Sequence, residues 1–269
     1  MNASRLLGVG VGPGDPELIT VKAVRVLAEA GLVLVPVMAG AGPAEPGRAE
    51  AIVRAHIDGT RVRRVPFTLN DRGGVTPGRL AAWDAAAHEV AAAFAAGTRT
   101  VAFATIGDPN MYSTFSYLAH TVRTLVSGVT VETVPGITAM QDLAARSGTV
   151  LAEGSESLVL LPLVRPSGTG VEAPLRLMRE SLRSYDTVVA YKLGAAPARS
   201  GTGAAADISA LLAALAQAGR LDDAVYGARL GLPDQDIRPA SELAGTDAVP
   251  YLSTLVAPGR RSGIGSKLS

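Results

Sequence analysis

The sequence predicts an α/β fold made of two αβ domains. Three observations predict it: short apolar runs alternate with helix-like segments, many runs end in glycine or proline turns, and aromatic residues make up only 4% of the chain. Segments that alternate in this way form mostly parallel sheets flanked by helices. With 269 residues and 48% hydrophobic content, the chain can bury a large core divided between two domains.

The first domain should contain a mostly parallel sheet. Each expected strand is a short run of apolar residues bounded by turn residues, which is the pattern of a buried strand. The expected ranges are Leu6–Val11, Leu32–Val37, Arg61–Pro66, Thr100–Thr105 and Val129–Val134.

Helices should connect these strands. Asp15-Pro16-Glu17 indicates a helix start, because an acidic cap, a proline at the first position and a further acid are all favoured there. Gly31 and Gly97 should end the first and third helices. The expected ranges are Pro16–Ala30, Arg48–Ile57, Leu80–Ala96 and Tyr112–Val126. Loops should lie at Ala39–Gly47 and Phe67–Gly78, which are rich in turn-forming residues.

The second domain should repeat the αβ pattern around a mixed sheet. One more helix follows Pro135-Gly136, and loops should interrupt this half at Arg165–Pro174 and Gly194–Ala206. We place the domain boundary near residue 140, which assigns 1–140 to the N-terminal domain and 141–269 to the C-terminal domain. The expected strands are Ser157–Leu161, Thr187–Tyr191, Ala224–Arg229 and Tyr251–Val256.

The composition argues against several classes of protein. The 25 basic and 24 acidic residues leave no basic excess of the kind a nucleic-acid binder shows. Without cysteine there is no disulfide, thiolate nucleophile or cysteine-ligated metal. His56, His88 and His120 lie far apart and in no metal-binding spacing. We therefore expect neither a nucleic-acid partner nor a bound metal.

The chain should be cytoplasmic and should not contact a membrane. No apolar run reaches the roughly 18 residues that span a bilayer. Met1 to Arg5 leads directly into a predicted strand and does not form a signal peptide.

A glycine-rich turn follows the first predicted strand. The segment Gly8–Asp15 resembles a dinucleotide-binding fingerprint, but Asp15 or Pro13 occupies the position of its third glycine. The second strand also ends in Val35-Pro36 instead of an acid that would bind a ribose. These departures argue against an ordinary Rossmann site. The glycines still allow a ligand close to the backbone, although a plain tight turn is the alternative.

Two further turns follow strands directly. In Ile106–Phe115, Gly107 allows close approach, and Asp108, Ser113 and Thr114 offer polar contacts. The alternative is that Asp108 only caps a helix. The third turn is Val134–Ala139, which would mean little in isolation. Ligands bind at the carboxyl ends of parallel strands, so the three turns together are candidates for one site.

Taken in order, the three turns resemble the signatures of the tetrapyrrole methylases, a family of S-adenosyl-L-methionine-dependent enzymes. The segment from Gly10 to Thr20 with Lys22-Ala23 resembles the first signature, Gly107-Asp108-Pro109 the second and Val134–Thr138 the third. The resemblance covers nearly the whole chain. It implies two α/β domains, S-adenosylmethionine as methyl donor in the cleft between them, no required metal, a tetrapyrrole acceptor and a homodimer.

Within the family, the precorrin-2 C20-methyltransferases and their cobalt-factor counterparts are the most similar subgroup. The similarity lies in residues 107–118, 151–158, 186–189 with Lys192, and 250–254. It implies methylation of C20 of precorrin-2 to give precorrin-3A in cobalamin biosynthesis. Thr138-Ala139-Met140-Gln141 departs from the subgroup, as Gly47-Arg48-Ala49 does from the family. A cobalt-containing acceptor, another acceptor and a non-catalytic tetrapyrrole carrier therefore remain alternatives.

The resemblance also implies which residues border the methyl donor. No catalytic base is implied. For Lys192, the alternative to a role in cofactor binding is an ordinary surface lysine at the end of a strand. By family correspondence, the cofactor-binding residues are Pro13, Ile106, Gly107, Asp108, Met111, Ser113, Thr114, Thr138, Ala139, Lys192 and Gly231.

The acceptor carries many carboxylates and a large conjugated ring. Arginine forks bind carboxylates, so arginines on loops and strand ends are candidates to hold it, with a solvated surface as the alternative. Aromatic residues after Gly107 could form or support the floor under the ring. The candidates are Arg48, Arg63, Arg64 and Arg72, and Tyr112, Phe115 and Tyr117.

Overall fold

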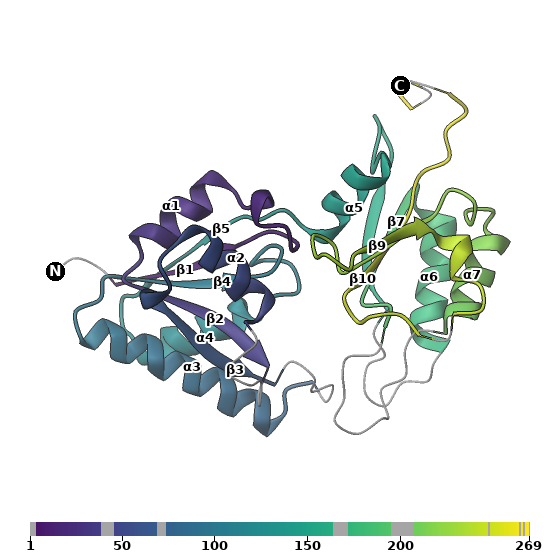
Figure 1. Cartoon of the computed structure of the whole chain (residues 1–269). Helices are drawn as coiled ribbons and strands as arrows, with labels where there is room; N and C mark the ends of the chain where they lie inside the picture. Colours follow the sequence, from purple (N-terminus) through teal and green to yellow (C-terminus); the bar gives the residue numbers. More distant parts are fainter. Residues whose placement is uncertain are drawn as a thin grey trace. The chain divides into compact units, whose positions relative to one another are not determined.

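The computed structural model of the chain divides into two compact units, Met1–Thr138 and Ala139–Ser269 (Figure 1). It describes residues 4–38, 46–68, 74–163, 172–194, 207–246, 248–263, 265 and 267–268. Most of three expected loops, Ala39–Gly47, Arg165–Pro174 and Gly194–Ala206, lies outside these ranges, as does Arg72. The two-domain α/β prediction is confirmed.

In the first unit, the described strands form a parallel sheet in the order β3-β2-β4-β1-β5. The register pairs Gly10 with Thr105 and Val9 with Val134. Strands β4, β1 and β5 therefore end side by side at one edge. The bounds are β1 Arg5–Gly10, β2 Leu32–Met38, β3 Val62–Phe67, β4 Thr100–Thr105 and β5 Thr130–Val134.

Helices cover both faces of this sheet, because side chains along each strand point alternately to opposite faces. Leu6 belongs to the core under α3 and α4, and its neighbour Leu7 belongs to the core under α1 and α2. The bounds are η1 Pro16–Leu18, α1 Val21–Glu29, α2 Arg48–His56, η2 Gly59–Arg61, α3 Pro77–Ala95 and α4 Phe115–Leu125.

The predicted starts of two helices in this unit are wrong. The expected helix Pro16–Ala30 is broken, because Thr20 is extended and its side chain accepts a hydrogen bond from Ala23 N at 3.1 Å, which caps α1. The helix expected from Tyr112 begins only at Phe115. The backbone of Tyr112 has a φ of 52°, a left-handed conformation that an α-helix cannot include.

In the second unit, the described strands form a mixed sheet in the order β6-β7-β10-β8-β9. Strands β6 and β7 are parallel, and the other pairs are antiparallel. The strands are β6 Leu158–Pro162, β7 Thr187–Tyr191, β8 Val225–Ala228, β9 Asp236–Pro239 and β10 Ser253–Ala257. The helices are α5 Ala139–Ser147, α6 Glu172–Ser184, α7 Ile208–Gln217 and η3 Ala240–Leu243.

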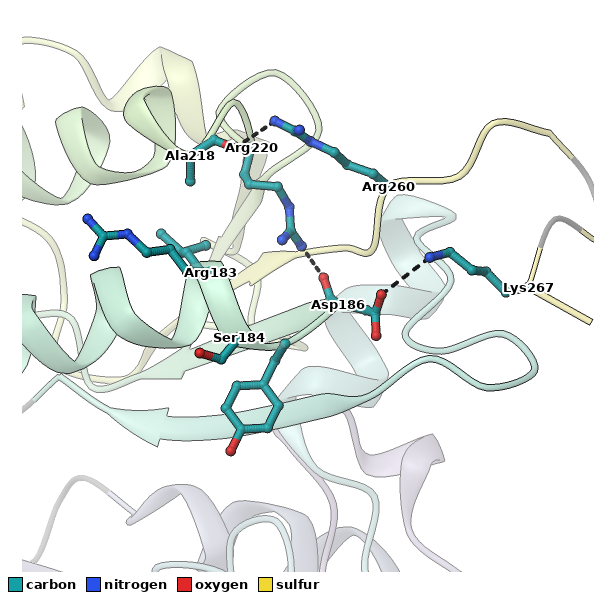
Figure 2. Close-up of a pocket in the computed structure, with 9 residues that line it drawn as sticks. Arg183, Ser184, Asp186, Ala218, Arg220, Arg260 and Lys267 are labelled. Atoms are coloured by element: carbon teal, nitrogen blue, oxygen red, sulfur yellow. Dashed lines mark hydrogen bonds and ion pairs between the residues drawn. The ribbon is translucent and has the colours of Figure 1, made fainter. Parts of the chain in front are cut away.

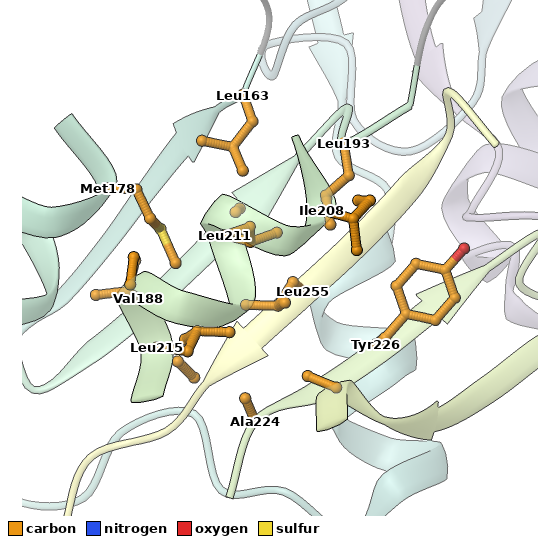
Figure 3. Packing of buried hydrophobic residues seen from close by; sticks show 14 of the residues in the cluster. Leu163, Met178, Val188, Leu193, Ile208, Leu211, Leu215, Ala224, Tyr226 and Leu255 are labelled. Carbon is orange, nitrogen blue, oxygen red and sulfur yellow. The ribbon is translucent and has the colours of Figure 1, made fainter. Parts of the chain in front are cut away.

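The larger core of the second unit lies between the sheet and helices α6 and α7 (Figure 3). Met178 of α6 and Leu211 and Leu215 of α7 are buried in it with Val188 of β7 and Leu255 of β10. A smaller core lies on the other face of the sheet, under α5. It contains Val189 and Val256, which follow Val188 and Leu255 along their strands. Its buried members are Leu143, Val189, Leu230 and Val256.

Candidate cofactor and acceptor site

Three turns meet at the carboxyl edge of the first sheet. Gly12 follows β1, Gly107 follows β4 and Gly136 follows β5, and these strands are neighbours. Gly12 and Gly107 form an antiparallel bridge, in which Gly107 N donates to the Gly12 carbonyl at 2.8 Å. Segments about a hundred residues apart along the chain therefore lie in contact.

Glycine is required where these turns pack backbone against backbone. A Cβ on Gly10 would lie 2.5 Å from Gly107 O and 2.6 Å from Gly136 N, and a Cβ on Gly136 would lie 2.8 Å from Gly10 Cα. Such distances leave no room for a side chain. Gly107 differs, because its φ of 69° favours glycine while a Cβ there would meet nothing within 4 Å. Its open side leaves space for a ligand to approach the backbone.

Asp108 ties the second turn to the third. One carboxylate oxygen accepts from Asn110 N at 2.8 Å, and the other accepts from Gly136 N at 3.0 Å. Asp108 therefore orders two turns at once and does not cap α4, which begins at Phe115.

Hydroxyl groups hold the chain between the second turn and α4. Ser113 Oγ donates to Thr105 Oγ1 at 3.1 Å and accepts from Phe115 N at 3.2 Å. Thr114 precedes α4, and its side chain makes no capping bond to the helix. The other expected residues nearby are Pro13 and Thr138, which are buried, and Ile106 and Met111, which are half-buried.

Two expected residues of the second unit, Lys192 and Gly231, share one edge of its sheet. Strand β10 pairs antiparallel with both β7 and β8, so β7 and β8 run in the same direction. Lys192 follows β7, and its N–H donates to Ser253 O at 3.0 Å. Gly231 lies three residues beyond β8, and its N–H donates to the side chain of Gln235 at 3.3 Å. Ala139 is the first residue of α5.

Backbone strain coincides with the predicted site. Among the described residues, the non-glycine positions with positive φ are Tyr112 at 52°, Lys192 at 61° and Arg229 at 50°. Tyr112 and Arg229 lie within two residues of Met111 and Gly231, and Lys192 is itself predicted to bind cofactor. Such conformations cost about 1–3 kcal/mol each and gather at functional sites.

One contact near Lys192 was not expected. The Tyr191 hydroxyl accepts from Met140 N at 2.9 Å, which joins the start of α5 to the end of β7. The sequence pattern reads Tyr191 only as the last residue of an apolar strand, so it gives no signal for this bond.

Of the three candidate floor aromatics, two have structural roles. Phe115 is 3% exposed and fills the space above Gly8, where a Cβ would collide with its ring. Tyr117 stacks on Trp83 with ring centroids 4.4 Å apart. Tyr112 remains 48% exposed after the second turn.

The candidate arginines of β3 have carboxylate partners in their own unit. Arg64 binds the fully buried Glu50 at 2.7 Å, and Arg54 binds it at 2.8 Å. Burial raises the pKa of Glu50, but the hydrogen bonds from Arg64, Arg54 and Gly47 N outweigh burial and hold the pKa below its usual value. Arg63 pairs with Glu89. Both β3 arginines therefore already bind a carboxylate of the protein itself.

A cavity of about 260 Å³ in the second unit has a basic lining (Figure 2). Arg220 donates to the carbonyls of Asp186, Ala257 and Pro258, and Arg260 donates at 2.6 Å to the carbonyls of Ala218 and Gly219 that follow α7. Asp186 precedes β7, whereas Lys192 follows it, so this cavity lies at the opposite edge of the sheet. Arg220, Arg260 and Lys267 hold the C-terminal segment in place.

A second ionic cluster holds the same C-terminal segment. The side chain of Glu156 is buried, accepts from Glu153 N at 2.9 Å and pairs with Arg261, which also lies 3.2 Å from the carboxylate of Glu153. The segment 153–156, which resembles the C20 subgroup, therefore has a structural role in this unit.

The described residues show neither a metal-binding cluster nor a membrane-spanning helix. No group of three or more histidine, aspartate or glutamate side chains among them is arranged to hold a metal ion. No helix within the described ranges is long and apolar enough to cross a membrane.

The fold is that of a two-domain α/β protein in which three turns are joined at the carboxyl edge of a parallel sheet. The family model for Tetrapyrrole (Corrin/Porphyrin) Methylases matches residues 5–244, and the chain belongs to this family. It is therefore an S-adenosylmethionine-dependent methyltransferase, as the three motifs predict.

Relatives match along almost the whole chain. A "Precorrin-2 C(20)-methyltransferase" from Sinorhizobium sp is 34% identical, with 96% of this chain and 97% of that protein covered. A "Cobalt-precorrin-2 C(20)-methyltransferase" from Salmonella typhimurium is 30% identical, with 94% of this chain and 95% of that protein covered.

Solved structures share the fold at lower identity. The methyltransferase CobJ superposes with a TM-score of 0.62 at 22% identity, covering 97% of this chain and 98% of CobJ. Cobalt precorrin-4 methyltransferase CbiF gives 0.61 at 20% identity, covering 94% of each chain.

Proposed function

We propose that this protein transfers a methyl group from S-adenosylmethionine to C20 of precorrin-2, giving precorrin-3A in cobalamin biosynthesis. The observation that carries the proposal is the near full-length similarity to C20-methyltransferases. The three joined turns support it, because they preserve the family motifs at one sheet edge.

The residues at this edge fit a methyl donor. The open side of Gly107 leaves space at the backbone, and the bonds of Asp108 and Ser113 fix the turns around it. A bound sulfonium donor supplies an already activated methyl group, so the chain need provide no nucleophile. The new C20–methyl bond forms as the sulfur–methyl bond breaks, the sulfonium becomes a neutral thioether, and the methylated macrocycle releases one proton to solvent. The chain's part is to position the two reactants and exclude water.

We assign the expected residues to the methyl donor as part of this proposal. Asp108 orders the turns, and the others border the bound molecule. Calorimetry with S-adenosylmethionine and its demethylated product on chelator-treated protein tests this assignment and the absence of a metal requirement. Heat of binding is expected with both ligands, and its absence with both would contradict the proposal.

A cobalt-containing acceptor is the second candidate, because the Salmonella relative is a cobalt-precorrin-2 enzyme by name. Incubation with S-adenosylmethionine and either precorrin-2 or cobalt-factor II, followed by mass spectrometry, separates the two. We expect a gain of one methyl group on precorrin-2. Transfer only to the cobalt compound would favour the second candidate, and transfer to neither would contradict both.

We further propose a cytoplasmic homodimer that contacts neither nucleic acid nor membrane. The near balance of 25 basic and 24 acidic residues and the family membership support this. Sedimentation equilibrium is expected to give twice the chain mass of 27.4 kDa, and a monomer would contradict the dimer.

A further inference from the structure

Tyr112 combines backbone strain with an exposed aromatic ring at the site. Its φ of 52° is unusual for a bulky residue, and its side chain is 48% exposed. Neither feature contributes to the hydrophobic core of the first unit, which contains Phe115 and not Tyr112.

The neighbours of Tyr112 impose this conformation. On one side, Met111 N donates to Asp108 O at 3.2 Å. On the other side, Ser113 is fixed by its bonds to Thr105 and to Phe115 N. The turn is therefore determined from both ends, and the strain at Tyr112 is retained although glycine would relieve it.

We propose that Tyr112 positions the tetrapyrrole acceptor by packing its ring against the macrocycle at the carboxyl edge of the first sheet. This inference rests on the proposed function and deepens it. An exposed aromatic ring suits a large, flat conjugated ligand, because the two faces can stack without a directional hydrogen bond. The neighbouring Gly107 leaves the adjacent space open.

The test is Tyr112→Asn, because asparagine tolerates left-handed backbone but cannot stack. Precorrin-2 is titrated by absorbance in the presence of the demethylated donor, and S-adenosylmethionine affinity is measured by calorimetry. We expect precorrin-2 affinity to fall about ten-fold, the size of effect seen when an aromatic stacking platform is removed, while donor affinity changes less than about two-fold. Tyr112→Phe should restore precorrin-2 binding.

Two further variants make the result decisive. Tyr112→Gly removes the ring and relaxes the backbone, so it replaces the asparagine variant if that fails to fold. Tyr185→Asn is the matched control, because Tyr185 is 43% exposed but lies in the other unit, beside the basic cavity. Unchanged precorrin-2 affinity in Tyr112→Asn and Tyr112→Gly, or an equal loss for both ligands in these two variants, would overturn the assignment. Wild-type protein that binds no precorrin-2 would instead contradict the proposed function together with this inference.

Discussion

Asp108 shows how one side chain can join motifs that lie apart in the sequence. Its two oxygens accept from backbone N–H groups of the second and third turns, at 2.8 and 3.0 Å. Charge-assisted bonds of this kind are stronger than neutral ones. The carboxylate therefore fixes the spacing of the turns, even without touching the methyl donor itself.

Asp108→Ala should weaken the reaction strongly while the protein stays folded. Loss of a hydrogen bond to a charged group costs about 1.5–3 kcal/mol, which is roughly ten- to a hundred-fold in donor affinity. Turnover at low S-adenosylmethionine concentration measures it, with circular dichroism as the check on folding. A variant with wild-type turnover under these conditions would show that Asp108 has no role in the site.

At the scale of elements, apolar runs predicted most of the structure correctly. The expected strand Thr100–Thr105 coincides with β4, and Thr187–Tyr191 coincides with β7. Strand β9, Asp236–Pro239, was missed, because a four-residue edge strand with two charges and a proline has no apolar pattern.

The errors in the helices have local causes. The side chain of Thr20 caps α1, and the side chain of Ser113 binds Phe115 N ahead of α4. Both side-chain bonds compete with the backbone hydrogen bonds that would continue the helix. Helix propensity alone does not predict which of the two kinds of bond forms. The bond between Asp108 and Gly136 was equally hidden, because it depends on β4 and β5 ending at one edge.

Arg261 should be important for stability, because it neutralises the carboxylates of Glu153 and Glu156. Arg261→Ala would leave the buried Glu156 uncompensated, at an expected cost of about 3–5 kcal/mol in the free energy of unfolding. Urea denaturation measures this. The matched control is Arg176→Ala, which breaks an exposed pair with Glu180 and should cost less than about 1 kcal/mol. Equal effects of the two substitutions would contradict the account.

The attachment of the C-terminal segment at Asp186 should be sensitive to acid. Hydrogen bonds from Ser157 N and Oγ, together with Lys267, lower the pKa of Asp186 to about 2. Because this pKa is depressed, the stabilisation is present above the ordinary aspartate value of 3.8 and is lost as pH falls towards 2. Asp186→Asn should therefore destabilise the protein at pH 6, and the difference from wild type should shrink below pH 4. A difference that does not depend on pH would contradict this.

At the scale of the whole molecule, each unit places a set of predicted residues at one sheet edge. The first unit presents three glycine turns at the ends of β1, β4 and β5, and the second presents Lys192 and Gly231 beyond β7 and β8. The family motifs predicted the three turns that lie together at this edge, and we propose that these turns bind the methyl donor. Acceptor choice was harder to predict, since Arg63, Arg64, Phe115 and Tyr117 proved to have partners inside the first unit.

Transfer of the methyl group to C20 of precorrin-2 is tested most directly by locating the transferred methyl group in the product. Wild-type protein is incubated with precorrin-2 and S-adenosylmethionine carrying a carbon-13 methyl label, and the product is examined by carbon-13 NMR. We predict a single labelled methyl group on the C20 bridge carbon. A label on any other carbon, or no transfer to precorrin-2 and cobalt-factor II alike, would contradict it.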